Sequence, residues 1–175
     1  MRSIGRGIVL GLVASVALAH PHFNKTVTAT LSPGVDVTIT YNTTPANETH
    51  AQTAKVGDFV TPRRPVLKLS AELKTEKATL PAGEYTIGVI KNGEKDWTMA
   101  LYPGVPARGE TPDPAKILKL ESQFETDKGT AEHMLIDLTP GHGKFEGRAV
   151  LTLHFGTLFL AGALSDAPPA PPAAK

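Results

Sequence analysis

Apolar and polar residues alternate in several short runs along this chain. The clearest run carries Val35, Val37, Ile39 and Tyr41, with polar residues between them. Because successive side chains of a strand point to opposite faces, this period of two predicts a strand with one buried face. Similar alternation predicts strands at residues 23–31, 67–73, 85–89, 97–101, 134–138 and 151–155, and an apolar run after Gly156 predicts a last strand at 158–164. Residues 116–124 fit either a short helix or a strand, of which we favour the strand.

The runs at 85–89 and 97–101 are predicted to pair as the central hairpin of the domain. Asn92-Gly93 lies between them, and both residue types tolerate the positive φ of a tight type I′ turn. Pro81-Ala82-Gly83 supplies the turn before the hairpin. We therefore expect a two-residue turn at Asn92-Gly93.

The whole pattern predicts eight or nine short strands separated by Pro and Gly turns, with no convincing amphipathic helix. The fold class that follows is all-β: an antiparallel β-sandwich or a jelly-roll-like barrel. Residues 42–65 interrupt the alternation with Thr, Asn, charged residues and three prolines. Such a long irregular connection is more often functional or mobile than merely connecting.

The first nineteen residues have the character of an export signal. Arg2 and Arg6 precede an uncharged apolar run at residues 8–18, and Ala17-Leu18-Ala19 offers small residues to a signal peptidase. The run is shorter than the roughly 20 residues that span a bilayer. We expect cleavage after Ala19, with a second register after Ala17, a β-sandwich domain at 20–165, and a disordered Pro/Ala-rich tail at 166–175.

Composition narrows the compartment and the partners. The chain has 175 residues, 18 basic and 17 acidic, and no cysteine. Removing residues 1–19 leaves 16 basic and 17 acidic residues, so no strong field points to nucleic acid. The absence of cysteine excludes disulfides and thiolate chemistry. We expect a periplasmic or secreted protein with no transmembrane segment in the mature chain and an envelope-associated partner as one option.

Several of these segments resemble the DUF2911 family of exported bacterial proteins. The resemblance rests on residues 67–73, on Leu80-Pro81-Ala82-Gly83-Glu84-Tyr85, and on Asp96-Trp97-Thr98. Residues 132–138 and 151–157 resemble the two closing strands of that family. It implies an exported β-domain, and it carries no activity, because the family is one of unknown function.

The chain also departs from the family pattern. The family has a V-W-R-x-G segment before its third strand, whereas this region carries Arg63-Arg64 and no tryptophan. His154 stands where the family tends to have tryptophan. These differences describe a divergent member.

The predicted new amino terminus is the sharpest candidate for chemistry. Cleavage after Ala19 makes His20 the first residue, with Pro21 and His22 next. The amine and imidazole of a terminal histidine, with a second histidine, form a three-nitrogen set that copper favours. The arrangement resembles the histidine brace of copper proteins. Pro21 has no N–H, which breaks the square-planar amino-terminal copper motif, and cleavage after Ala17 removes the site altogether.

A more distant copper ligand could come from the other histidines. His133 and His154 lie on predicted strands, with His154 opposite the apolar face of its strand. His50 lies in the long irregular connection and His142 between two glycines. Taken singly, each is more often a surface histidine than a ligand. The metal set we predict is His20, His22, His154 and His133.

No other motif indicates an enzyme. The chain lacks G-x-S-x-G, H-E-x-x-H and paired cysteines, and Gly141-His142-Gly143-Lys144 joins two strands, so it has no helix dipole with which to hold phosphate. The leading hypothesis is a non-enzymatic exported binding module of unknown ligand. The alternative is a copper-binding protein, with redox activity as one option. A carbohydrate-binding module would need a row of exposed aromatic residues, which Trp97 and Tyr102 alone do not make.

Overall fold

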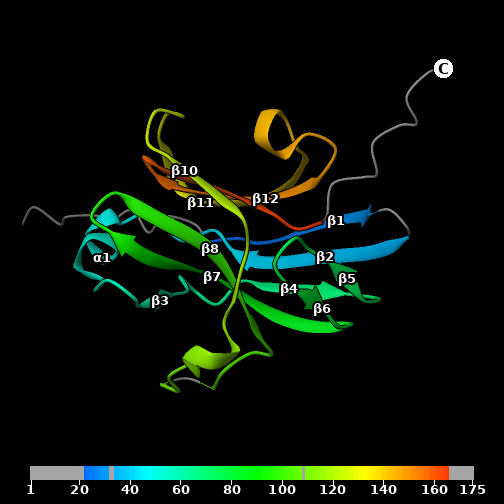
Figure 1. The fold of residues 1–175 in the computed structure, drawn as a ribbon. Helices are drawn as coiled ribbons and strands as arrows, with labels where there is room; N and C mark the ends of the chain where they lie inside the picture. The colour runs from blue at the N-terminus through cyan, green and yellow to red at the C-terminus, as the bar shows by residue number, and fades with distance from the viewer. Residues whose placement is uncertain (1–21, 32–33, 108, 166–175) are drawn as a thin grey trace, which may run out of the picture.

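The computed structural model describes residues 22–31, 34–107 and 109–165, and it has an all-β, sandwich-like fold (Figure 1). Its elements in chain order are β1 (Asn24–Leu31), β2 (Val35–Asn42), α1 (Glu48–Thr53), β3 (Phe59–Val60), β4 (Val66–Leu69), β5 (Leu73–Lys74), β6 (Thr79–Leu80), β7 (Gly83–Gly93), β8 (Asp96–Pro103), η1 (Pro114–Lys116), β9 (Leu118–Lys119), β10 (Ser122–Glu125), β11 (Ala131–Pro140), η2 (Gly143–Phe145), β12 (Ala149–Gly156) and β13 (Leu158–Ala163).

Two antiparallel sheets form the sandwich. The larger has the order β1-β2-β4-β7-β8-β9, with β3 also paired to β7, and the smaller has the order β10-β13-β12-β11. In Figure 1 the smaller sheet lies above the larger one. The chain leaves the larger sheet at β9 and enters the smaller one at β10, so each sheet is built from a continuous part of the sequence. The predicted β-sandwich class is confirmed.

The core lies between the two sheets and follows the alternation of the sequence. Every second residue of β2, from Val35 to Tyr41, is buried, and Asp36 and Thr40 are exposed. From the other side, the smaller sheet contributes Met134, Ile136 and Leu151, each at most 1% exposed. Because these inward positions interlock, burial of apolar surface is the main stabilising term of the fold.

The two sheets come into close contact between β13 and β8. A Cβ added at Gly162 of β13 would lie 2.7 Å from Cβ of Met99 on β8. Met99 is fully buried, so its side chain has no free space to move into. Glycine at position 162 therefore allows the backbone of the smaller sheet to contact the core of the larger one.

The prediction of the hairpin is right for its strands and wrong for its turn. β7 pairs with β8, and Gly93 lies opposite Asp96, so the two connecting residues are Glu94 and Lys95. Asn92 and Gly93 belong to β7 and have no positive φ. A bulge between Lys91 and Gly93 moves the turn two residues past the expected site.

Two further expectations need correction. Residues 42–65 contain the six-residue helix α1 and the strand β3, where we expected no regular element. The predicted strand at 67–73 is divided into β4 and β5. With other short strands, this division gives thirteen strands among the described residues in place of eight or nine. The short strands β3, β5, β6 and β9 have two residues each, which is too few for a recognisable alternation.

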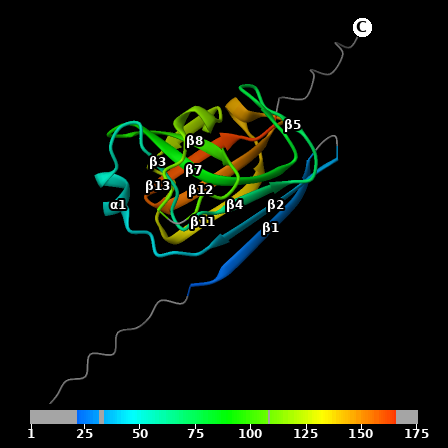
Figure 2. The same cartoon turned by 90° about the horizontal axis from the view of Figure 1, so that it is seen from below.

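Helix α1 lies at one end of the sandwich and β5 at the other, as two perpendicular views show (Figures 1 and 2). Asn47 caps α1 by accepting a hydrogen bond from the Thr49 amide at 3.1 Å. No described helix is long and apolar enough to cross a membrane. The predicted signal at 1–19 and tail at 166–175 lie outside the described residues.

Candidate functional site

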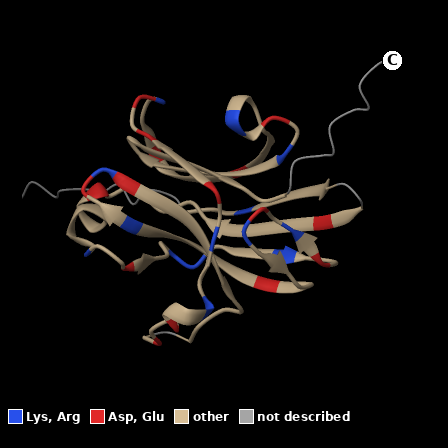
Figure 3. Ribbon diagram, viewed as in Figure 1, with Lys and Arg blue, Asp and Glu red and all other residues tan. Residues whose placement is uncertain are grey.

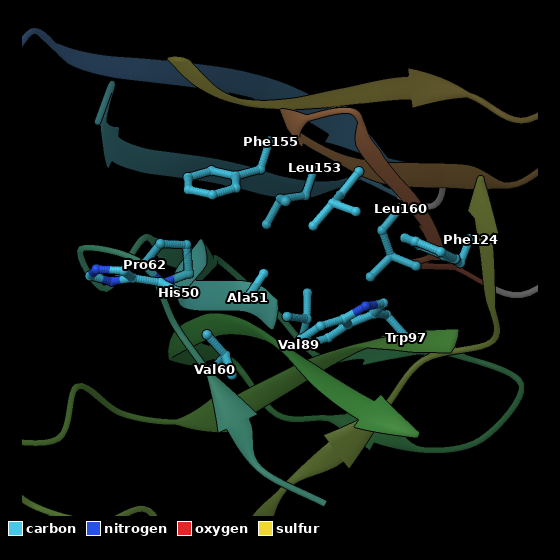
Figure 4. Close-up of a pocket in the computed structure, with 11 residues that line it drawn as sticks. His50, Ala51, Val60, Pro62, Val89, Trp97, Phe124, Leu153, Phe155 and Leu160 are labelled. Atoms are coloured by element: carbon cyan, nitrogen blue, oxygen red, sulfur yellow. The ribbon is translucent and has the colours of Figure 1, made fainter. Parts of the chain in front are cut away.

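An apolar cavity of about 70 Å³ lies between the two sheets at the end where α1 sits (Figure 4). The larger sheet contributes Val60, Val89 and Trp97, and the smaller sheet faces them with Phe124, Leu153, Phe155, Leu158 and Leu160. His50, Ala51 and Pro62 complete the lining. Only His50 and Trp97 carry a polar side-chain atom, so the cavity offers mainly dispersion contacts to a guest.

The strands position these side chains by the same alternation that builds the core. Val89 and Trp97 stand on the inward face of the central hairpin, and Leu153 and Leu160 stand opposite them on β12 and β13. The inner part of the wall is tightly covered: Trp97 is 6% exposed and Leu160 3% exposed. The cavity is therefore a local gap in the packing between the sheets.

Helix α1 lies against the mouth of the cavity and is held there by a lysine from β7. Lys91 Nζ donates hydrogen bonds to the Gln52 carbonyl at 2.9 Å and to the Ala54 carbonyl at 2.8 Å. The side chain of Lys91 is buried in this arrangement. Since a six-residue helix has little stability of its own, these bonds keep α1 in place.

A glutamate at the other end of α1 ties the helix to the smaller sheet. The Glu48 carboxylate accepts a hydrogen bond from the Thr157 amide in the turn between β12 and β13. Gly156 has a φ of 64°, and a Cβ there would collide with the Glu48 side chain. Helix α1 thus bridges both sheets beside the cavity.

The loop that follows β3 has an unusual backbone at the cavity mouth. Pro62 lines the mouth beside His50 (Figure 4), and the next two residues, Arg63 and Arg64, have φ values of 56° and 47°. These are left-handed conformations that non-glycine residues rarely adopt. β3 and β4 both pair with β7. Residues 62–65 therefore form a short loop that connects two strands paired with the same strand, β7.

The charged side chains elsewhere are of both signs and are interspersed over the sheets and loops (Figure 3). Four of them form a cluster of ion pairs. Arg148 pairs with Glu121 and, at 3.2 Å, with Glu76. Lys144 also pairs with Glu121, at 3.2 Å. A side-chain hydrogen bond with Glu76, with those from Arg148 and Lys144, lowers the pKa of Glu121 to about 2 against the opposing effect of desolvation. None of these four residues lines the apolar cavity, so we interpret the cluster as a structural ion network.

The structure places the predicted metal ligands on three different strands or their ends. His22 Nδ1 lies 3.3 Å from the Thr43 carbonyl oxygen at the start of β1. His133 lies on β11 in a bridge with Pro45, and His154 lies on β12 with Nε2 3.4 Å from the Gly129 carbonyl oxygen. The ring of His154 meets that of Phe159 edge-on at 5.5 Å.

These histidines do not form a metal site among themselves. In the part of the chain that the structure describes, no three His, Cys, Asp or Glu residues are grouped so that they could hold a metal ion. His20, the residue on which the copper hypothesis depends, lies outside the described residues. A copper site would therefore need His20 to bring further ligands to one of these histidines.

The aromatic residues considered for carbohydrate binding are buried. Trp97 is 6% exposed and Tyr102 is 8% exposed, so neither offers a flat face to a sugar at the surface. The alternation of the sequence placed Trp97 on a strand with one buried face but did not show that it lines a cavity. It also placed His50 in an irregular loop, although His50 lies on α1 at the cavity mouth.

Comparison of the chain with protein-family models, with curated proteins and with solved structures gave no match. The resemblance to DUF2911 proteins stays a prediction. The functional argument rests on the cavity and its surroundings.

Proposed function

We propose that this protein is an exported binding module whose cavity between the two sheets takes up a small apolar molecule or group. The observation that carries the proposal is the cavity of about 70 Å³, which has apolar side chains on both sheets and a mouth beside α1. Binding sites for small molecules are commonly such concave, largely preformed apolar clefts. The lining holds no carboxylate, hydroxyl or thiol, and His50 is its single titratable side chain, which favours binding over catalysis.

The size of the cavity limits the guest. An engineered apolar cavity of about 150 Å³ takes up benzene, so about half that volume accommodates only a few carbon atoms. Each buried methylene contributes about 0.8 kcal/mol. A guest such as 1-hexanol, with about three of its methylenes in the cavity and the others at the mouth, would gain about 2.4 kcal/mol, which corresponds to a Kd on the order of 10 mM.

Trp97 makes the test direct, because it is the single tryptophan of the chain and it lines the cavity. We expect 1-hexanol to shift the fluorescence of Trp97 saturably, with amide chemical-shift changes centred on β8, β12 and β13. The variant Val89→Phe, which fills the cavity, should weaken hexanol binding at least about tenfold. Val105→Phe is the matched control, because Val105 is 47% exposed and lies outside the cavity.

The proposal fails if hexanol produces no saturable change, or if Val89→Phe and Val105→Phe bind hexanol as the native protein does. Thermal unfolding of both variants checks that each is folded at the temperature of the titration. Mass spectrometry of the protein made by its native host tests export, since cleavage after Ala19 gives a chain that begins at His20.

A second candidate function is copper binding through His20, and one observation favours it. The segment that follows β2 contacts two of the predicted ligands. Thr43 contacts His22, and Pro45 forms a β-bridge with His133. The Met134 amide also donates to the Thr44 carbonyl at 2.8 Å. A chain that begins at His20 would therefore start two residues from a histidine that is anchored near β11.

Copper(II) titration of the processed protein with electron paramagnetic resonance tests this candidate. We expect one tight equivalent with nitrogen hyperfine structure, lost when one alanine precedes His20 and weakened in His133→Gln. His142→Gln is the control, because His142 lies in the turn before η2. Binding that ignores the added alanine would end the copper hypothesis.

A further inference from the structure

The residue that follows the cavity mouth in sequence is a cation that has no partner in the described part of the chain. Arg63 is exposed and directly follows Pro62, which lines the mouth. No ion pair or hydrogen bond of the Arg63 side chain occurs among the described residues. Arg64, in contrast, is engaged, because its Nη1 donates to the Pro106 carbonyl at 2.8 Å.

We infer that the guest of the cavity is a small anionic amphiphile, with its apolar part between the sheets and its carboxylate at Arg63. This inference rests on the proposed function, since it names the ligand class of the same cavity. A carboxylate matches the planar fork of a guanidinium, which can donate two parallel hydrogen bonds. The apolar lining would hold the tail of this ligand, and Arg63 would bind its carboxylate.

The backbone of the loop supports a positioned arginine. Pro62 and Pro65 have fixed φ angles at the two ends of Arg63-Arg64. Both arginines adopt left-handed conformations, and Arg64 is further restricted because it precedes a proline. Two hydrogen bonds hold the ends of this loop against β7. The Thr61 hydroxyl donates to the Ile87 carbonyl at 2.9 Å, and the Ile87 amide donates to the Pro65 carbonyl at 2.8 Å. Strained backbone that is held this firmly is typical of ligand sites.

Two acidic residues, one in α1 and one in the loop that follows it, already have partners. Glu48 accepts from the Thr157 amide, and Asp58 accepts from the Lys55 amide at 2.8 Å. Both carboxylates are thus engaged by backbone amides. Arg63 follows the lining residue Pro62 directly, so it is the cation that we assign to an anionic ligand at this opening.

The test compares hexanoate with 1-hexanol, two guests of the same chain length that differ in the head. At neutral pH and low salt we expect hexanoate to bind about fivefold more tightly than hexanol, as an exposed ion pair allows. In Arg63→Gln this affinity ratio should fall to about one, and in Arg63→Lys most of it should remain. Lys74→Gln is the control for charge, because Lys74 lies on β5 at the far end of the sandwich (Figure 2).

The outcomes separate this inference from the proposed function. If neither hexanol nor hexanoate binds, the apolar cavity is not a site and the proposed function fails. If hexanol binds and hexanoate binds no better, or if Arg63→Gln keeps the native affinity ratio, the inference of an anionic head group is wrong. The cavity then remains a binding site for apolar molecules. A ratio that falls equally in Lys74→Gln would reduce the effect to overall charge and overturn the role of Arg63. Added salt should lower the native ratio toward one.

Discussion

Lys91 Nζ lies 5.7 Å from the centroid of the Trp97 ring, and the same ammonium donates hydrogen bonds to the last turn of α1. Trp97 is a wall of the cavity, and α1 stands at its mouth. Lys91 is only 8% exposed, so its charge is stabilised by the aromatic face and by the carbonyl oxygens of Gln52 and Ala54. This one side chain couples the wall of the cavity to its entrance.

Replacing Lys91 with methionine should detach α1. The substitution keeps the length of the side chain but removes the donors, which leaves two carbonyl groups without their partner. We expect the free energy of unfolding to fall by about 2 kcal/mol. Hydrogen exchange of the amides of α1 should accelerate more than that of β7.

Lys68→Met is the control for this change, because Lys68 is exposed on β4. It should alter stability by less than about 0.5 kcal/mol. Equal exchange rates of α1 in Lys91→Met and in the native protein would show that the helix is held by other contacts.

The strands could be predicted because a half-buried strand leaves a period of two in the sequence. The run from Val35 to Tyr41 shows this directly, since its buried and exposed residues alternate as predicted. The turn of the hairpin could not be predicted in the same way. Asn-Gly favours a turn locally, but the pairing of Lys91 with Trp97 and the bulge that follows place the turn at Glu94 and Lys95.

Helix α1 and the cavity depend on contacts between distant segments, so no local pattern announces them. The helix has six residues and no apolar stripe, and it is fixed by Lys91 from β7 and by the amide of Thr157. The residues that line the cavity look like ordinary core positions. Whether two sheets leave a gap depends on how their side chains meet, which the alternation of one strand does not encode.

The tyrosine of the Leu80-Pro81-Ala82-Gly83-Glu84-Tyr85 segment secures the turn that precedes it. The Tyr85 hydroxyl donates to the Pro81 carbonyl at 2.7 Å, and burial raises the pKa of this phenol. Tyr85→Phe should lower the free energy of unfolding by about 1 kcal/mol through loss of this bond.

Tyr41→Phe is the matched control for the loss of a hydroxyl. Tyr41 is as buried as Tyr85, and its hydroxyl makes no hydrogen bond to the described residues. Urea unfolding followed by Trp97 fluorescence measures both variants. Equal losses of stability in the two would contradict the role of the bond to Pro81.

Gly162→Ala should destabilise the sandwich through overpacking. The added methyl would lie 2.7 Å from Cβ of Met99, and neither backbone can withdraw without disturbing its sheet. We expect a loss of about 1–3 kcal/mol in the free energy of unfolding. Gly93→Ala is the control, since the nearest atom to its methyl is Cβ of Asp96 at 3.9 Å. A Gly162→Ala protein as stable as Gly93→Ala would mean that the sheets can separate slightly at no cost.

The ion network at Glu121 should make stability depend on pH in the acidic range. The folded pKa of Glu121 is about 2, below its ordinary value of 4.5, so the folded protein binds this proton less readily than the unfolded chain does. The contribution is therefore fully present above about pH 5 and is lost as the pH falls toward about 2. Because the pair is partly exposed, solvent screening limits the contribution to about 1 kcal/mol.

Glu121→Gln removes the titrating group and leaves Arg148 with Glu76. Near pH 6 we expect this variant to be about 1 kcal/mol less stable than the native protein, and the difference should shrink as the pH is lowered toward about 2. Glu72→Gln is the control, because Glu72 is exposed and makes no ion pair among the described residues. Urea unfolding at a series of pH values measures the difference. A difference that stays constant over this range would assign the effect of Glu121 to packing, and a difference that grows as the pH falls would contradict the lowered pKa.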